Sequence, residues 1–364
     1  MPMKVELVTG ATGMLGSALV LELLSRTDSD IRCLVRAHDA ASASAKLWNA
    51  LAATADDLGL EAELQRRDAR SRVQAVLGDI GVPGCGLSLS HERISRVWHC
   101  AATLRYESAF AAETHHANVT GTVNVMATAR ANEAELVHVS TAYVSGTRHG
   151  VQLEQLPDPH QRFNNTYERT KAAAEHIVAQ SRSNWRIVRP SAVIASSRTR
   201  RTGHTSGLYD LAAKVQRFRR QYQRRYGAIL EARPLRLCGD ENCEINLVPL
   251  DYVASAIVRI GLDGPPHTIF HATNSSAPRA REVYDAVLTT AGLMPPRFVE
   301  EADDLDAVDR LLANAIAFHY PYIISDKSFD QAHTESVVGS GALAFHASVD
   351  VIHELLNPRE PSYR

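Results

Sequence analysis

The sequence is poor in cysteine and contains no long apolar run. Its five cysteines lack C-x-x-C spacing, so we expect reduced thiols, no disulfide framework and no metal site. No run of 18 apolar residues occurs, and the first residues have the pattern of a strand rather than that of a signal peptide. These absences predict a cytoplasmic protein that does not insert into a membrane.

The chain also carries almost no net charge. It has 364 residues, of which 45% are hydrophobic and 22% charged, and its formal net charge is −2. This balance gives the whole molecule no strong attraction to nucleic acid or to an anionic membrane. The composition is that of a globular chain, long enough for one large domain or two smaller ones, and it excludes a disordered or fibrous protein.

A glycine-rich segment, VTGATGMLG at residues 8–16, stands near the start of the chain. Gly10, Gly13 and Gly16 lie between an apolar run typical of a buried strand and a leucine pattern typical of a helix. Glycines let the backbone turn tightly and approach a phosphate, while the N–H groups at the start of the helix face the negative charge. Turns and helix caps also use glycine, but the strand–loop–helix context predicts a dinucleotide-binding turn.

The residue at the end of the second strand bears on the choice of cofactor. Residues 31–36 have a strand pattern that ends at Arg36, and the first acidic residue, Asp39, comes three positions later. An acidic residue at this tip binds the 2′-hydroxyl of NAD, whereas an arginine pairs with the 2′-phosphate of NADP. The sequence favours NADPH; the alternative is that Arg36 is a solvated strand end.

Two further strands are predicted at residues 73–77 and 96–102, after a helical crossover in residues 40–75. The first ends in Gly78-Asp79-Ile80. Asp79 is either an adenine contact or a turn residue that caps the following segment. The second ends in Ala101 and Ala102, small residues where the chain would pass beneath the cofactor.

A hydroxyl-rich segment, STAYVSG at residues 140–146, follows a fifth predicted strand at 136–139. In doubly wound sheets, ligands bind at such carboxyl ends of central strands. Further on, Tyr167 and Lys171 lie one helical turn apart, on one side of a predicted helix. We expect the Lys171 ammonium to favour the phenolate and to lower the pKa of Tyr167 from about 10. This spacing also occurs by chance in many helices.

The order of these motifs resembles that of the extended short-chain dehydrogenase/reductases over the first 190 residues. The matching segments are residues 9–16, 78–80, HCAA at 99–102, NVTGT at 118–122, Ser140-Thr141, and Tyr167-x-x-x-Lys171. Within that superfamily the chain is similar to the thioester reductases, which include product-releasing domains of peptide and polyketide synthetases, and to the fatty acyl-CoA reductases. The segments that carry this closer resemblance are LVRA at 34–37 with the long insertion after it, VSTAYV at 139–144, IVRPS at 187–191, VPLDYV at 248–253, IFHATN at 269–274 and HYPY at 319–322.

The resemblance implies an α/β fold with a doubly wound parallel sheet and a smaller, mostly helical substrate-binding region. The NADP-binding domain is expected at 1–190, with 245–275 returning to it, and the substrate region at 191–244 and 276–364. The implied catalytic residues are Thr141, Tyr167 and Lys171. The implied cofactor-binding residues are Gly10, Thr12, Gly13, Met14, Leu15, Gly16, Arg36, Asp79, Ile80, Ala101, Ala102, Lys171, Pro190 and Val193.

The resemblance also implies a mechanism. NADPH would deliver hydride to the carbon of an acyl thioester, while Tyr167 and Thr141 stabilise the charge that develops on its oxygen. Lys171 would hold the nicotinamide ribose and tune Tyr167. The hemithioacetal would collapse to an aldehyde and a thiol, and a second hydride could give the alcohol. Because no adenylation or carrier domain is recognised, we expect a stand-alone enzyme with a thioester supplied by a carrier protein or coenzyme A.

A basic helix bears on the partner. Between residues 208 and 226 an apolar stripe lies opposite Arg217, Arg220 and Arg224. These arginines are a candidate docking site for an acidic carrier protein or for the phosphates of coenzyme A. The alternative is an ordinary solvated face. Nucleic acid is disfavoured because no stacking platform or recognition motif accompanies the charge.

Two other functions remain open at this point. One is a different activity on the same scaffold, such as a nucleotide-sugar epimerase or dehydratase, or a hydroxysteroid-type dehydrogenase. The other is a non-catalytic NADP-binding regulator, against which the presence of both Tyr167 and Lys171 argues.

Overall fold

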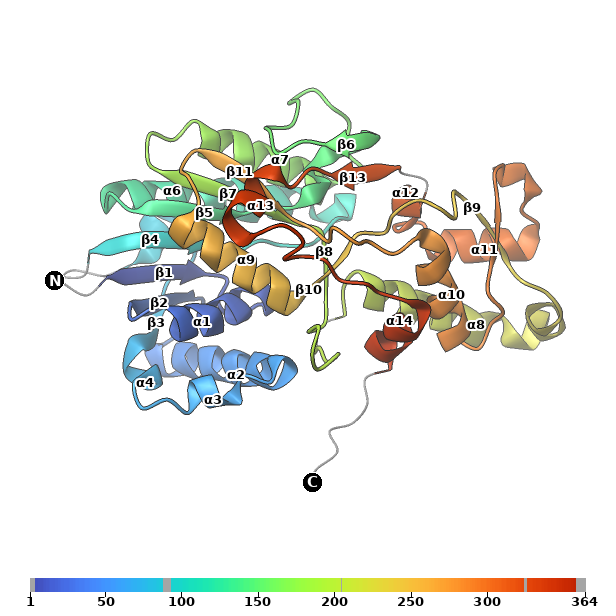
Figure 1. Cartoon of the computed structure of the whole chain (residues 1–364), viewed down its shortest axis with the longest axis horizontal. Coiled ribbons are helices and arrows are strands. Elements are labelled where there is room, and N and C mark those ends of the chain that lie inside the picture. Colours follow the sequence, from blue (N-terminus) through green and yellow to red (C-terminus); the bar gives the residue numbers. More distant parts are fainter. Residues whose placement is uncertain (1–3, 88–92, 204, 324–325, 358–364) are drawn as a thin grey trace.

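Seven parallel strands form the central sheet of the computed structural model, which describes residues 4–87, 93–203, 205–323 and 326–357 (Figure 1). Their order is β11-β7-β5-β4-β1-β2-β3, so the strand order reverses beside β1. This is the doubly wound arrangement predicted from the sequence. The strands are β1 (Val5–Thr9), β2 (Asp30–Val35), β3 (Val73–Leu77), β4 (Ile94–His99), β5 (Glu135–Val139), β7 (Trp185–Pro190) and β11 (Thr268–Ala272).

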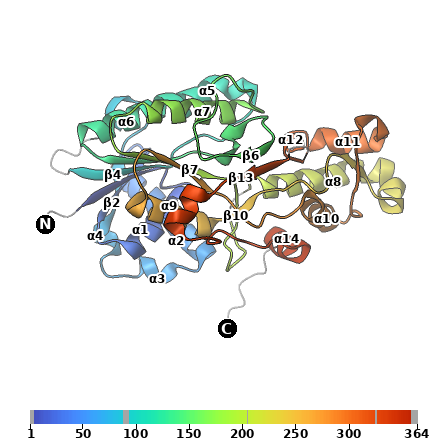
Figure 2. The same ribbon diagram turned by 45° about the horizontal axis from the view of Figure 1, so that its top comes forward.

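Two layers of helices cover the sheet, and the view in Figure 2 separates them. Strands 1, 2, 4, 5 and 7 are almost continuously buried because helices pack on both of their faces. One layer contains α1 (Met14–Arg26), α2 (Ala40–Leu58), α3 (Glu61–Leu64), α4 (Ala69–Arg72), α9 (Leu250–Asp263) and α13 (Ala332–Val338). The other contains α5 (Ala111–His115), a π-helical turn (His116–Thr120), α6 (Gly121–Ala131) and α7 (Thr166–Ala179).

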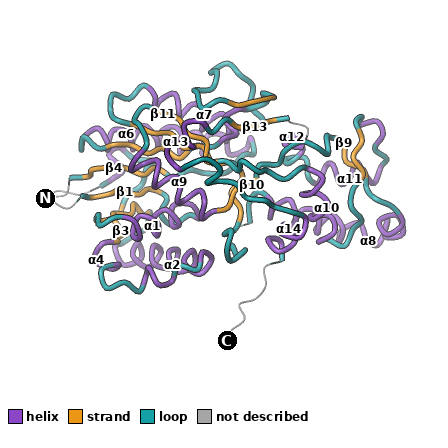
Figure 3. Tube along the Cα trace, viewed as in Figure 1, coloured by secondary structure: helices purple, strands orange, loops and turns teal. Residues whose placement is uncertain are grey.

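A second region, mostly helical as predicted, extends from the carboxyl end of the sheet (Figure 3). Its own apolar core includes Val215, Phe218, Tyr284 and Leu312. Tyr252 packs against this core and against the core of the sheet region, so it joins the two. The helices are α8 (Leu208–Ala232), α10 (Ala280–Thr290), α11 (Ala307–Ala315), α12 (Tyr320–Ile323) and α14 (Val349–Leu356), with the paired strands β9 (Arg236–Cys238) and β12 (Arg297–Val299).

Two short parallel strand pairs lie where the regions meet. β8 (Ala192–Ile194) pairs with β10 (Leu247–Pro249), and β6 (Gly150–Gln152) pairs with β13 (Lys327–Phe329). Short 3₁₀ segments lie at Pro83–Gly86, Ser108–Phe110, Ala142–Ser145 and Ala302–Asp304. Among the helices that the structure describes, none is long and apolar enough to cross a membrane.

The course of the late chain differs from the prediction, which assigned all of 276–364 to the substrate region. After β13 the chain returns to the sheet, where α13 packs on α9 and β11. Val338 and Leu343 are buried in the core of the sheet region. The prediction failed here because a helix of seven residues with two adjacent valines has no periodicity that identifies its partner.

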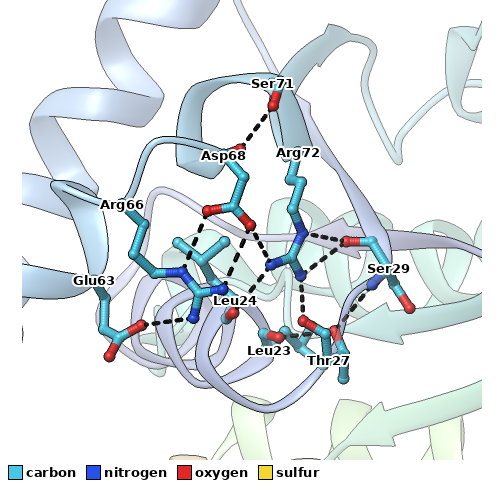
Figure 4. Close-up of polar contacts among 9 residues, drawn as sticks. All are labelled: Leu23, Leu24, Thr27, Ser29, Glu63, Arg66, Asp68, Ser71 and Arg72. Atoms are coloured by element: carbon cyan, nitrogen blue, oxygen red, sulfur yellow. Dashed lines mark hydrogen bonds and ion pairs between the residues drawn. The ribbon is translucent and has the colours of Figure 1, made fainter.

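A buried arginine fixes the crossover between β2 and β3 (Figure 4). Arg72 donates to the carbonyl oxygen of Leu24 in the last turn of α1 and to those of Thr27 and Ser29 just after it. It also pairs with Asp68 at 3.1 Å. Carbonyls at a helix end lack partners within the helix, and a cation there is stabilising. Arg72 therefore ties α4 and the start of β3 to α1, the helix that carries the glycine-rich turn.

Candidate active site

The glycine-rich turn joins β1 to α1 by close backbone contacts. Gly10 has a φ of +74°, and a Cβ built on it would lie 2.6 Å from the backbone nitrogen of Ala101. A Cβ on Gly16 would lie 2.1 Å from the carbonyl oxygen of Gly10. Gly13 caps α1 without any side-chain hydrogen bond, and both it and Thr12 are exposed. The start of α1 is therefore open to an anion, as a pyrophosphate requires.

The chain after β4 lies directly against this turn. The backbone N–H of Ala101 donates to Thr9 Oγ1 at 3.3 Å, and Ala102 is exposed. Small side chains here leave space beside the turn. Of the other residues implied by the resemblance, Met14 and Leu15 are half-buried at the start of α1, Pro190 is buried at the end of β7, and Val193 is half-buried in β8.

The tips of β2 and β3 place an exposed cation beside an acidic turn. The side chain of Arg36 is 83% exposed, and its Nη1 lies 3.8 Å from Asp79 Oδ2. Asp79 Oδ1 accepts a hydrogen bond from the Gly81 backbone N–H at 2.8 Å, so the turn-capping role is present. The Ile80 side chain packs against Gly121, because a Cβ built on Gly121 would lie 2.7 Å from Ile80 Cδ1. Arg36 has the freedom to swing onto a phosphate at this edge.

The hydroxyl-rich tip of β5 is buried. Thr141 Oγ1 accepts a hydrogen bond from the backbone N–H of Tyr143 at 3.3 Å and caps the following 3₁₀ turn. A hydroxyl that accepts one bond still has its own proton to donate. Ser140 Oγ is also buried and has no hydrogen-bond partner among the described residues. Both hydroxyls thus keep a hydrogen-bonding capacity that no described residue uses.

Tyr167 and Lys171 lie one turn apart on α7, as predicted, but the electrostatics differ from the prediction. The Lys171 ammonium is buried and donates to the carbonyl oxygen of Val139 at 2.7 Å, and burial lowers its pKa to about 8. Burial and the neighbouring Glu168 raise the pKa of Tyr167, whereas we expected Lys171 to lower it. The expected effect is missing because the ammonium is held by β5 and a carboxylate lies next to the phenol.

Glu168 is a residue that the sequence analysis missed. Its carboxylate is fully buried and accepts hydrogen bonds from Asn164, Asn165 and, at 2.7 Å, from the hydroxyl of Tyr322. Burial raises its pKa, and these donors oppose the shift. Tyr322 belongs to α12 of the second region, so this bond joins that region to the first turn of the helix that carries Tyr167. A carboxylate in the first turn of a helix was the available signal.

Asn118 is a second residue whose role the sequence did not reveal. It lies in the π-helical turn between α5 and α6, and its side chain bonds both backbone groups of Thr103. Its amide also donates to Thr170 Oγ1 at 3.1 Å. π-helical turns are frequent at functional sites. Here the turn holds the loop after β4 and α7 in fixed positions around the candidate site.

The predicted basic face lies on α8. Arg217, Arg220 and Arg224 are exposed, and none of the ion pairs or hydrogen bonds found among the described residues involves their side chains. Two neighbouring cations are engaged, since Lys214 pairs with Asp210 at 2.8 Å and Arg219 donates to the Ala291 carbonyl oxygen at 2.7 Å. The side chains of these three arginines are therefore exposed and not engaged by any described residue.

The sheet is parallel and doubly wound, and its glycine-rich turn lies where the strand order reverses. This arrangement is typical of dinucleotide-binding proteins. The family model described as male sterility protein, an NAD-binding family, matches residues 8–257. The chain belongs to this family. This result confirms the resemblance stated from the motifs and establishes a nicotinamide dinucleotide as the type of cofactor.

Two curated relatives and one solved structure place the chain further. A linear gramicidin synthase from Brevibacillus parabrevis is 28% identical over 286 residues, which are 75% of this chain and 5% of that protein. The fatty acyl-CoA reductase wat of Drosophila melanogaster is 29% identical over 237 residues, 56% of this chain and 45% of that protein. The chain therefore spans less than half the length of either relative.

The solved structure is the terminal R domain from the myxalamid PKS-NRPS biosynthetic pathway. It superimposes with a TM-score of 0.74 at 24% identity and covers 98% of this chain and 90% of that domain. This likeness confirms the fold, including the second region, over the part of the chain that the superposition covers.

Proposed function

We propose that the chain reduces an acyl thioester, bound to a carrier protein or to coenzyme A, to an aldehyde, with an alcohol as the product of any second reduction. One observation carries the proposal. The glycine turn, the Thr141 tip and the α7 helix with Tyr167 and Lys171 meet at the carboxyl edge of one sheet, in a family whose relatives include a fatty acyl-CoA reductase. The catalytic set is Thr141, Tyr167 and Lys171.

NADPH is the proposed form of the cofactor, and it supplies the hydride when bound. The open start of α1 fits its pyrophosphate. Gly10 and Gly16 let the backbone of the turn pack closely enough to form that start, because a Cβ at either glycine would run into backbone atoms. Arg36 is the proposed partner of the 2′-phosphate, since its side chain is exposed and no acidic residue stands at the tip of β2. Lys171 would bind the ribose next to the nicotinamide.

The protein side of the chemistry is stabilisation of the carbonyl oxygen. Thr141 and Tyr167 donate hydrogen bonds to that oxygen as negative charge develops, and fixed donors act most strongly in a site that excludes water. The raised pKa of Tyr167 keeps the phenol protonated at neutral pH, so it meets the substrate oxygen as a hydrogen-bond donor. Collapse of the resulting hemithioacetal releases the aldehyde and the free thiol.

Tyr167→Phe tests the assignment. We expect its turnover of an acyl-coenzyme A or acyl-carrier substrate to fall by about 10²–10⁴-fold, with NADPH affinity nearly unchanged, because the phenol acts on the substrate oxygen. Turnover near that of the wild type would show that Tyr167 is not the proton donor. Product analysis also separates the proposal from an epimerase, since an epimerase consumes no net NADPH.

The arginines of α8 are the proposed docking site for an acidic carrier protein or for the phosphates of coenzyme A. Replacing Arg217, Arg220 and Arg224 by serine should raise the Michaelis constant for the carrier-bound substrate and weaken its dependence on salt, with kcat little changed. A matched control replaces Arg67 and Arg130 of the sheet region, which are also exposed and whose loss should leave that constant unchanged. An unaltered constant in the α8 variant would remove the hypothesis.

A further inference from the structure

A row of polar side chains crosses three central strands of the sheet near their carboxyl ends, beneath α6 and α7. Thr9 of β1, His99 of β4 and His138 of β5 are in register on three adjacent strands. All three are at most 1% exposed. The two imidazole rings are 5.2 Å apart. The mechanism proposed above uses none of these three residues.

The first imidazole is fully bonded. His99 Nδ1 lies 2.8 Å from Thr9 Oγ1, and its Nε2 lies 3.1 Å from Thr122 Oγ1 on α6. Burial and the charge of Lys171 lower the pKa of His99 to about 3, so the ring is neutral at any working pH. His99 thus forms a closed chain with two threonines and has no bond to Lys171.

The second imidazole is different. His138 Nε2 lies 3.4 Å from the Nζ of Lys171, while its Nδ1 is buried without a hydrogen-bond partner among the described residues. An ammonium only donates, so Nε2 carries the lone pair and the proton of the neutral ring is on Nδ1. Burial and the nearby Lys171 lower the pKa of His138 well below its usual value, which keeps the ring neutral and able to accept.

We propose that His138 is a positioning residue for Lys171. Together with the Val139 carbonyl oxygen, it holds two of the three N–H groups of the ammonium against β5. One N–H then remains for a ligand at the carboxyl edge of the sheet. The inference rests on the proposed role of Lys171 in binding the ribose of the cofactor.

The groups around the Lys171 ammonium determine how much the contact with His138 affects its protonation. Burial lowers the pKa of Lys171, whereas Glu175 on α7 and Cys100 after β4 raise it. The carboxylate of Glu175 is already bonded to Arg189, at 2.6 and 2.9 Å. His99 is neutral, and Tyr167 is protonated. His138 and Val139 are therefore the direct acceptors that favour the charged form of Lys171, and loss of one should make the amine easier to deprotonate.

The test compares His138→Leu, which removes the acceptor, with His138→Gln, whose amide oxygen replaces it. NADPH affinity is measured by fluorescence titration between pH 6 and 10, and kcat for an acyl-coenzyme A over the same range. In the leucine variant we expect binding to weaken about tenfold at pH 8 and its alkaline midpoint to move down by about one unit, with most of both restored in the glutamine variant. If leucine prevents folding, methionine takes its place.

His99→Gln is the matched control, because His99 is as buried as His138 but does not touch Lys171. It should lower the free energy of unfolding and leave the alkaline midpoint unchanged. Equal midpoints in the leucine, glutamine and wild-type proteins would overturn the proposal and leave His138 as packing. The binding titration needs no acyl substrate, so absence of thioester turnover in the wild type would contradict the proposed function without deciding the role of His138.

Discussion

The two regions of the molecule contribute to the candidate site in different ways, one through backbone contacts and the other through side chains. In the sheet region the cofactor turn is made of backbone, with Gly10 and Gly16 in contacts that admit no side chain. In the second region the connection to α7 is made of side chains, such as the bond from Tyr322 to Glu168. A backbone site tolerates almost no added atoms, whereas a side-chain contact can be exchanged at modest cost. Substitutions should therefore have very different effects in the two regions.

The glycine turn should show the largest effect. In Gly16→Val the new Cβ would fall 2.1 Å from the Gly10 carbonyl oxygen, so the backbone of the turn must move. We expect loss of NADPH binding by more than about 100-fold, or failure to fold, since overpacking against backbone has no side chain to relax. Gly203→Val is the matched control, because it makes the same substitution at an exposed glycine whose Cβ would meet no atom nearer than 4.0 Å. Titration of both variants with NADPH, after a check of their circular dichroism, measures the difference; equal affinities would refute the backbone argument.

Acid should destabilise the sheet region first. Burial lowers the pKa of His99 and of His271 to about 3, and that of His138 falls well below its usual value. The unfolded chain binds these protons near pH 6.5 and the folded chain does not, so stability falls as the pH drops from about 6.5 toward 3. Each histidine contributes about 1.4 kcal/mol per pH unit in that window, or roughly 4 kcal/mol for all three at pH 5.5.

Urea unfolding at pH 7.5 and 5.5 measures this loss. Tryptophan fluorescence reports on the sheet region, because Trp48, Trp98 and Trp185 are the three tryptophans of the chain and all belong to it. His271→Gln is the informative variant, since an amide can take over the bonds of His271 to Arg189 and to the Asp330 carbonyl oxygen without titrating. It should remove about a third of the loss. An unchanged loss would mean that other groups titrate.

The bond between the regions should matter less than the glycine turn. Tyr322→Phe removes a hydroxyl that donates to Glu168 at 2.7 Å and leaves the ring beside Tyr143, with ring centroids 5.0 Å apart. Loss of one donor to a buried carboxylate costs about 2 kcal/mol, and Asn164 and Asn165 still bond that carboxylate. We expect kcat/KM for the acyl substrate to fall about 30-fold, the ratio that corresponds to this energy, while NADPH affinity stays within about twofold. Equal losses in both quantities would place the effect in the fold and not at the junction of the regions.

Features that depend on local patterns could be predicted from the sequence, whereas those that depend on contacts between distant segments could not. The strand at Val73–Leu77, the turn at Gly10 and the Tyr167–Lys171 spacing are local patterns, so they were found without tertiary information. The pairing of β6 with β13 and the return of α13 to the sheet depend on contacts between short segments far apart in the chain. No local periodicity encodes such contacts. The direction of the Tyr167 pKa also needed the structure, because it depends on where the Lys171 ammonium and the Glu168 carboxylate lie.

Arg36 should give the smallest of these effects, because it lies at the exposed rim of the sheet region. Its side chain is 83% exposed and its ion pair with Asp79 is 3.8 Å long, so replacement by serine should leave the fold intact. A solvated contact to a 2′-phosphate is worth about 1.4 kcal/mol, so Arg36→Ser should weaken NADPH about tenfold and NADH hardly at all. The ratio of the two dissociation constants is the quantity to measure, since it cancels any general damage to the turn. An unchanged ratio would mean that Arg36 is the solvated strand end that the sequence left open, and that the choice between NADPH and NADH is made elsewhere on the rim.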